Sequence, residues 1–155
     1  MTTIERLYKL CESYETFDYK YLLSIAKEKA DYIYRMTRSR DGSEFAKNFL
    51  TIYSALLAQS GAPVSEKVYN FFVEATGFKD SLTYSEFVLL AKKSVTDLDF
   101  QILCSDYSKV HSLPKDFDNA MFLYAVVFIA CDGKSKSSEI GAIINFVPFG
   151  DFSDV

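Results

Sequence analysis

The chain has 155 residues, of which 49% are hydrophobic and 25% charged, and its formal net charge at pH 7 is −4. This length is that of one domain, which buries a core without needing a metal or a disulfide. A net negative charge gives no long-range attraction for a polyanion, so we expect no nucleic-acid partner.

Helix-capping residues and apolar spacing predict helices in the first part of the chain. A capping box at residues 2–5 opens a short first helix, and Asp18 is placed to cap a second. Asp41 and Glu44 repeat the capping pattern ahead of a third helix, which runs to a break at residues 60–61.

The same signals continue through the rest of the chain. Ser65 is placed to cap a fourth helix, and Gly77 stands where a chain leaves a helix in a left-handed conformation. Thr83 and Glu86 form a further capping box. Three more helices are expected: one from Asp97 to about residue 110, a buried one at residues 120–131, and one capped by Ser137 or Ser138. Without any hairpin signal, the sequence predicts an all-α, single-domain bundle of about seven to eight helices.

Cysteine usage and hydropathy bear on where the protein works. The cysteines Cys11, Cys104 and Cys131 are odd in number and far apart, which suits reduced thiols and predicts a cytoplasmic protein. The first residues contain no apolar stretch of the signal-peptide type, so we expect no export. The longest apolar run, at residues 120–131, is shorter than the roughly 17–25 residues of a membrane-spanning helix, so we expect no membrane span.

Two segments of the chain share one pattern. In the first, an apolar helix ends at Gly61 and Glu66 opens the next helix; in the second, the corresponding residues are Gly133 and Glu139. Glycine permits a positive φ at the turn, and glutamate is favourable near a helix N-terminus. The sequence therefore predicts two pseudo-repeated helix-turn-helix units.

This pattern resembles that of the TerB-like (tellurite-resistance B) family over residues 45–146. The resemblance implies a helical core at residues 43–147, with an N-terminal helical extension at residues 1–42 and a tail at residues 148–155. It also implies two units related by a pseudo-twofold axis and an association with stress.

The same resemblance implies a divalent cation bound by carboxylates. The matching positions are Asp132, Glu139 and Glu66. Ser60 stands where the family has an aspartate in the first unit, and Lys134 and Lys136 place positive charge in the turn of the second. Because these changes remove a ligand and repel a cation, the implied metal binding is weak or lost.

The chain carries no motif that demands catalysis. The patterns GxxxxGK[ST], GxGxxG and GxSxG are absent. His111 is the only histidine, and Cys104, its nearest cysteine in sequence, is two helical turns away, about 10 Å along a helix axis. We therefore expect a non-enzymatic protein with no cofactor other than the divalent cation.

Tyrosines gather near the N-terminus, and arginines follow them. Tyrosine is enriched at interfaces, so this region predicts a protein-binding surface or a homodimer contact; rings packed over the core are an equal alternative. The residues expected to contact a partner are Tyr19, Tyr21, Tyr32, Tyr34, Arg35 and Arg38. The arginines also suit RNA or an acidic protein, although the net charge favours a solvated helix end.

Two functions follow as hypotheses. The first is a TerB-like binding module associated with stress. The alternative is an immunity or inhibitor protein that masks a partner through the tyrosine-rich N-terminal surface.

Overall fold

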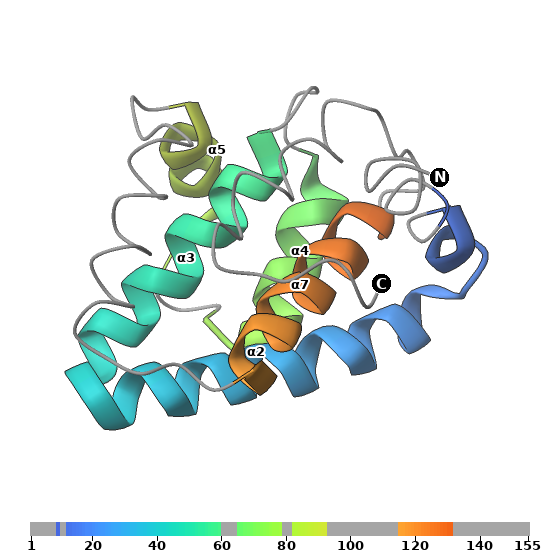
Figure 1. Cartoon of the computed structure of the whole chain (residues 1–155). Helices are drawn as coiled ribbons and strands as arrows, with labels where there is room; N and C mark the ends of the chain where they lie inside the picture. Colours follow the sequence, from blue (N-terminus) through green and yellow to red (C-terminus); the bar gives the residue numbers. More distant parts are fainter. Residues whose placement is uncertain (1–8, 10–11, 60–64, 79–81, 93–114, 132–155) are drawn as a thin grey trace.

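The computed structural model of the chain describes residues 9, 12–59, 65–78, 82–92 and 115–131 (Figure 1). In these ranges all regular structure is helical, which confirms the all-α prediction for this part of the chain. The helices are α2 (Tyr19–Asp41), α3 (Ser43–Gln59), α4 (Glu66–Thr76), α5 (Tyr84–Lys92) and α7 (Lys115–Ala130), and a short helical segment at residues 12–15 precedes α2. The turns predicted at Gly61 and Gly133, and the helices predicted from Asp97 and from Ser137 or Ser138, lie outside the described residues.

Local capping explains where most of these helices begin and end. The Asp18 carboxylate accepts from the Tyr21 N–H at 2.8 Å, and the Ser65 hydroxyl accepts from the Val68 N–H at 3.2 Å. Gly77 follows α4 with a φ of 77°, and its N–H donates to the Val73 carbonyl at 2.8 Å. Each of these predicted caps is confirmed.

The predicted capping box ahead of α5 is also confirmed. The Thr83 N–H donates to the Glu86 carboxylate at 3.0 Å, and the Glu86 N–H donates to the Thr83 hydroxyl at 3.2 Å. Hydrogen bonds from the Thr83 backbone and side chain lower the pKa of Glu86. The box therefore depends on an ionised carboxylate.

The prediction that Asp41 opens the third helix is wrong. Asp41 is the last residue of α2, and Gly42 separates α2 from α3. The φ of Gly42 is 94° and its ψ is 165°, a backbone conformation essentially restricted to glycine. The break between the two helices therefore falls at this glycine.

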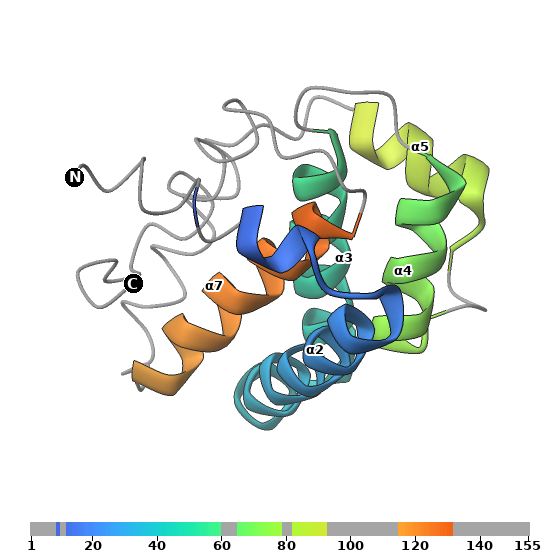
Figure 2. The same cartoon turned by 90° about the vertical axis from the view of Figure 1, so that its right-hand side faces the viewer.

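Helix α7 lies at the centre of the packing. It crosses α2 in Figure 1 and lies beside α2 in Figure 2, and it contacts α2, α3 and α4. Residues 120–131 are all buried except Leu123, which is half-buried. This confirms the predicted buried helix. The helix begins at Lys115, earlier than the apolar run indicated, because its first residues include exposed polar side chains such as Asp116 and Asn119.

Helix α2 contributes to the same core as the helices that follow it. It packs against α3, α4 and α7. Its buried apolar residues are Leu22, Ala26, Ala30 and Ile33. These recur at helical spacing, and the two alanines keep one stripe of the helix small, so neighbouring side chains approach its backbone.

Polar groups are buried where α3 meets α7. The Tyr53 hydroxyl donates to the Met121 carbonyl at 2.9 Å. The Ser54 hydroxyl donates to the Leu50 carbonyl at 2.8 Å and lies 2.6 Å from the Tyr124 hydroxyl. Because Ser54 has one proton and uses it on Leu50, Tyr124 must donate to Ser54. Burial raises the pKa of the Tyr124 phenol, so it keeps the proton that this bond requires.

Candidate functional site

The four predicted tyrosines of α2 divide between two faces of the helix. Tyr19 and Tyr34 are separated by about four helical turns, and Tyr21 and Tyr32 by about three, so each pair shares a face. The Tyr19 ring packs edge-on against Phe71 of α4, with ring centroids 5.7 Å apart. Tyr21 instead is 52% exposed. The six predicted partner residues therefore do not form one continuous surface.

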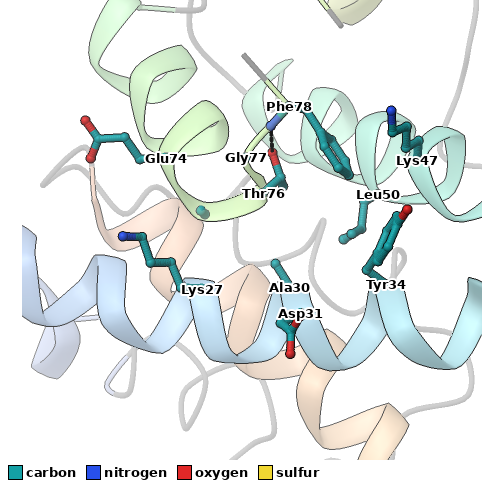
Figure 3. A pocket seen from close by; sticks show the side chains of 11 residues that line it. Lys27, Ala30, Asp31, Tyr34, Lys47, Leu50, Glu74, Thr76, Gly77 and Phe78 are labelled. Carbon is teal, nitrogen blue, oxygen red and sulfur yellow. Dashed lines mark hydrogen bonds between the residues drawn. The ribbon is translucent and has the colours of Figure 1, made fainter. Parts of the chain in front are cut away.

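An open cleft lies on the Tyr19 and Tyr34 side of α2. It has a volume of about 600 Å³ and is bordered by α2, α3 and the end of α4 (Figure 3). Its lining residues are Lys27, Ala30, Asp31 and Tyr34 from α2, Lys47 and Leu50 from α3, and the segment from Glu74 to Phe78 at the end of α4. Of the predicted partner residues, Tyr34 lines the cleft directly.

Both carboxylates of the cleft have partners. Asp31 pairs with Arg35 one helical turn along α2, with 2.9 Å between Oδ2 and Nε. Glu74 accepts a hydrogen bond from the Tyr19 hydroxyl at 3.3 Å. Burial raises the pKa of Tyr19 to about 12, and the negative charge of Glu74 adds to this shift. Tyr19 therefore stays a neutral donor at physiological pH.

The other end of the cleft is lined by the rings of Tyr34 and Phe78 and by Lys47, and Arg38 lies beside it on Tyr34. Tyr34 and Phe78 pack edge-to-face, with ring centroids 6.0 Å apart and an interplanar angle of 61°. The Arg38 guanidinium lies over the Tyr34 ring at 5.5 Å, and the Lys47 ammonium lies over the Phe78 ring at 5.9 Å. Each cation–π contact of this kind contributes about 0.5–1 kcal/mol at an exposed site, so the rings hold both cations at the edge of the cleft.

A second aromatic cluster lies where the chain enters α2. Phe17 packs edge-on against both Tyr14 and Tyr21, with centroids 5.3 Å and 4.9 Å apart. Phe17 is 41% exposed and Tyr21 is 52% exposed, so this cluster presents apolar surface to solvent. We call Tyr14, Phe17 and Tyr21 the entry cluster.

The predicted metal ligands are not assembled in the described part of the chain. Asp132 and Glu139 lie outside the described residues. Glu66 is exposed in the first turn of α4, directly after the capping Ser65, and therefore at the opposite end of α4 from the cleft. Among the residues that the structure describes, no group of three or more His, Cys, Asp and Glu side chains is placed to hold a metal ion.

Sequence reasoning missed most of the cleft. Phe78 had a usable signal, because an apolar residue just after a helix-ending glycine often packs back onto the helix. Lys47 and Glu74 carried none, since an exposed charge on a helix is ordinary. They join the site only because α3 and α4 meet α2 there.

Comparisons of this chain with models of protein families, with curated proteins and with solved structures found no match. Among the helices that the structure describes, none combines the length and the hydropathy needed to cross a bilayer. The cleft and the entry cluster are therefore the features of the described residues that bear on function.

Proposed function

We propose that this chain is a non-enzymatic, cytoplasmic binding module of the TerB-like type whose partner is a protein. The observation that supports a binding role is the cleft, where two aromatic rings hold Arg38 and Lys47 at an open edge. Aromatic residues and arginine are enriched in protein-recognition surfaces.

The TerB-like part of this proposal concerns the whole chain. On this proposal the chain has seven to eight helices in all, with two pseudo-repeated helix-turn-helix units. It acts in stress and binds a metal weakly at Asp132, Glu139 and Glu66. Helices α3 and α4, with Ser65 as a cap and Glu66 in the following turn, are consistent with the first unit.

Isothermal titration calorimetry with Ca²⁺, Mg²⁺ and Zn²⁺ tests the metal site. Binding heat that disappears in Asp132→Asn and Glu139→Gln would support it. An absence of heat at millimolar ion would remove the metal from the proposal and leave partner binding in place.

Partner binding is tested by immobilising the full chain on a support and incubating it with an extract of its native host. The protein retained by the chain is then purified, and its affinity is measured for wild type and for Tyr34→Ala, Arg38→Gln and Lys47→Gln. We expect these three variants to lower the affinity, while Lys67→Gln, at the far end of α4, leaves it unchanged. Equal affinities for all of them would refute a binding role for the cleft.

The entry cluster favours a second candidate function, that of an immunity or inhibitor protein. Phe17 and Tyr21 expose large aromatic side chains of the kind that anchor protein interfaces. On this reading, Phe17→Ser and Tyr21→Ser abolish neutralisation of the partner, whereas the cleft variants do not. The same pair of variants tests a homodimer by sedimentation, since loss of a dimer on substitution would assign the cluster to self-association.

A further inference from the structure

We propose that the Arg38 and Lys47 end of the cleft binds an acidic peptide segment of the partner protein. This inference rests on the proposed function and names the chemistry of the partner. The ligand carboxylates pair with the Arg38 guanidinium and the Lys47 ammonium, while the Tyr34 and Phe78 rings beneath hold these two cations in position.

The local charge supports an anionic ligand on a chain that is acidic overall. Lys27 and Lys47 balance Asp31 and Glu74 among the lining residues. Arg35 and Arg38 beside the cleft then leave an excess of two positive charges. The carboxyl end of α4 faces the cleft and contributes roughly half a negative charge, which is too little to offset this excess.

The two cations at the aromatic end are also available. Arg38 and Lys47 form no ion pair within the part of the chain that the structure describes, and their contacts there are with ring faces. An arginine guanidinium with no carboxylate partner can bind a ligand carboxylate through two parallel hydrogen bonds. The carboxylates already in the cleft do not compete, because Asp31 is held by Arg35 and Glu74 by Tyr19.

The dimensions favour a short extended peptide. The separation between the Arg38 and Lys47 charges cannot exceed the sum of the two cation–ring distances and the ring–ring distance, about 17 Å. An extended chain covers that span in about five residues. A nucleic acid is disfavoured because its charge density is opposed by the −4 charge of the rest of the chain.

Fluorescence anisotropy with the full chain tests the proposal directly. The probe is a fluorescein-labelled pentapeptide, Glu-Glu-Ser-Glu-Glu, compared with counterparts in which Gln or Lys replaces Glu. We expect the Glu peptide to bind at least about tenfold more tightly than the Gln peptide at low salt, and to weaken as salt rises. The Lys peptide is expected not to bind.

Variants assign the binding to the cleft. The double variant Arg38→Gln with Lys47→Gln is expected to lower the affinity for the Glu peptide by about tenfold, since each exposed ion pair contributes about threefold to fivefold in affinity. Lys67→Gln removes one positive charge about 15 Å away along α4, as each single cleft variant does, and is expected to have no effect. Tyr34→Ala keeps both positive charges but removes the ring that positions Arg38, so it is expected to weaken binding. Tyr34→Phe keeps the ring and is expected to bind like wild type.

Several results would overturn the proposal. Two concern the peptides: equal affinity for the Glu and Gln peptides, or tighter binding of the Lys peptide. The third is a double variant that binds the Glu peptide like wild type. The fourth is a labelled pentauridine that binds the same cations more tightly than the Glu peptide does. If the purified partner still loses affinity in the cleft variants while the peptides show no charge preference, the acidic ligand is excluded and the binding module stands. If the partner is insensitive to these variants, the proposed function fails and this inference fails with it.

Discussion

Replacing Ser54 is expected to destabilise the fold more than replacing its hydrogen-bond partner Tyr124. In Ser54→Ala, the bond to the Leu50 carbonyl is lost, and the Tyr124 hydroxyl, fully buried, loses the one acceptor it has among the described residues. A buried donor left without a partner costs about 1–3 kcal/mol, so we expect Ser54→Ala to lower the unfolding free energy by about 2 kcal/mol.

Tyr124→Phe is expected to cost less. It removes the donor to Ser54, but the Ser54 hydroxyl keeps its bond to Leu50 and no orphaned group remains. The expected loss is about 1 kcal/mol, the net value of one hydrogen bond. In the Ser54→Ala background the same substitution removes the orphaned hydroxyl, so the double variant is expected to be more stable than Ser54→Ala alone.

Urea unfolding followed by circular dichroism at 222 nm measures all three variants, with equal m values as the check that only stability changes. For a chain of this length the Ser54→Ala variant is expected to melt about 4–8 °C below wild type. If the losses of the two single variants simply add in the double variant, the assignment of Tyr124 as the donor to Ser54 is refuted.

The remaining predictions concern two turns and two ionisable groups. In urea unfolding, Gly42→Ala is expected to lower the unfolding free energy by about 2 kcal/mol and Gly77→Ala by about 1 kcal/mol. An added Cβ meets no atom within 4 Å at either site, so the loss comes from the positive φ alone, which is less favourable for alanine at Gly42. Equal losses would show that the turns are not held in these conformations. The pKa of Tyr19 is raised from 10.0 to about 12, so stability that is complete below pH 10 is expected to fall between pH 10 and 12, and Tyr19→Phe should flatten that slope. The pKa of Glu86 is lowered from 4.5, so its contribution is present above pH 4.5 and lost as the pH falls through the lower folded value; Glu86→Gln should remove this part of the acid dependence.

The features that the sequence predicted correctly are those that depend on residues a few positions apart. Asp18 bonds three residues on, Ser65 likewise, and Thr83 with Glu86 closes a box within one turn. Such local hydrogen bonds depend little on the tertiary structure around them. Asp41 has the same spacing to Glu44, but it is the last residue of α2, because the chain turns at Gly42 in a conformation essentially restricted to glycine.

The cleft could not be predicted from the sequence because its residues come from separate helices. The hydroxyl of Tyr19 and the carboxylate of Glu74 are 55 residues apart, and no periodicity links them. The rings of Tyr34 and Phe78 meet only because α2 passes the end of α4. The tyrosine enrichment located the relevant helix, but it did not separate the face toward α4 from the face that carries Tyr21.

The burial of α7 on nearly every side limits how the protein is made. Helices α2, α3 and α4 each cover part of α7, so none of them completes its apolar contacts until residue 131 has left the ribosome. At translation rates of roughly 5–20 residues per second, the interval between the end of α4 and the end of α7 is about 3–11 seconds. During that time the nascent chain exposes the apolar surface that α7 later covers. We expect chaperones that bind nascent chains to bind this surface.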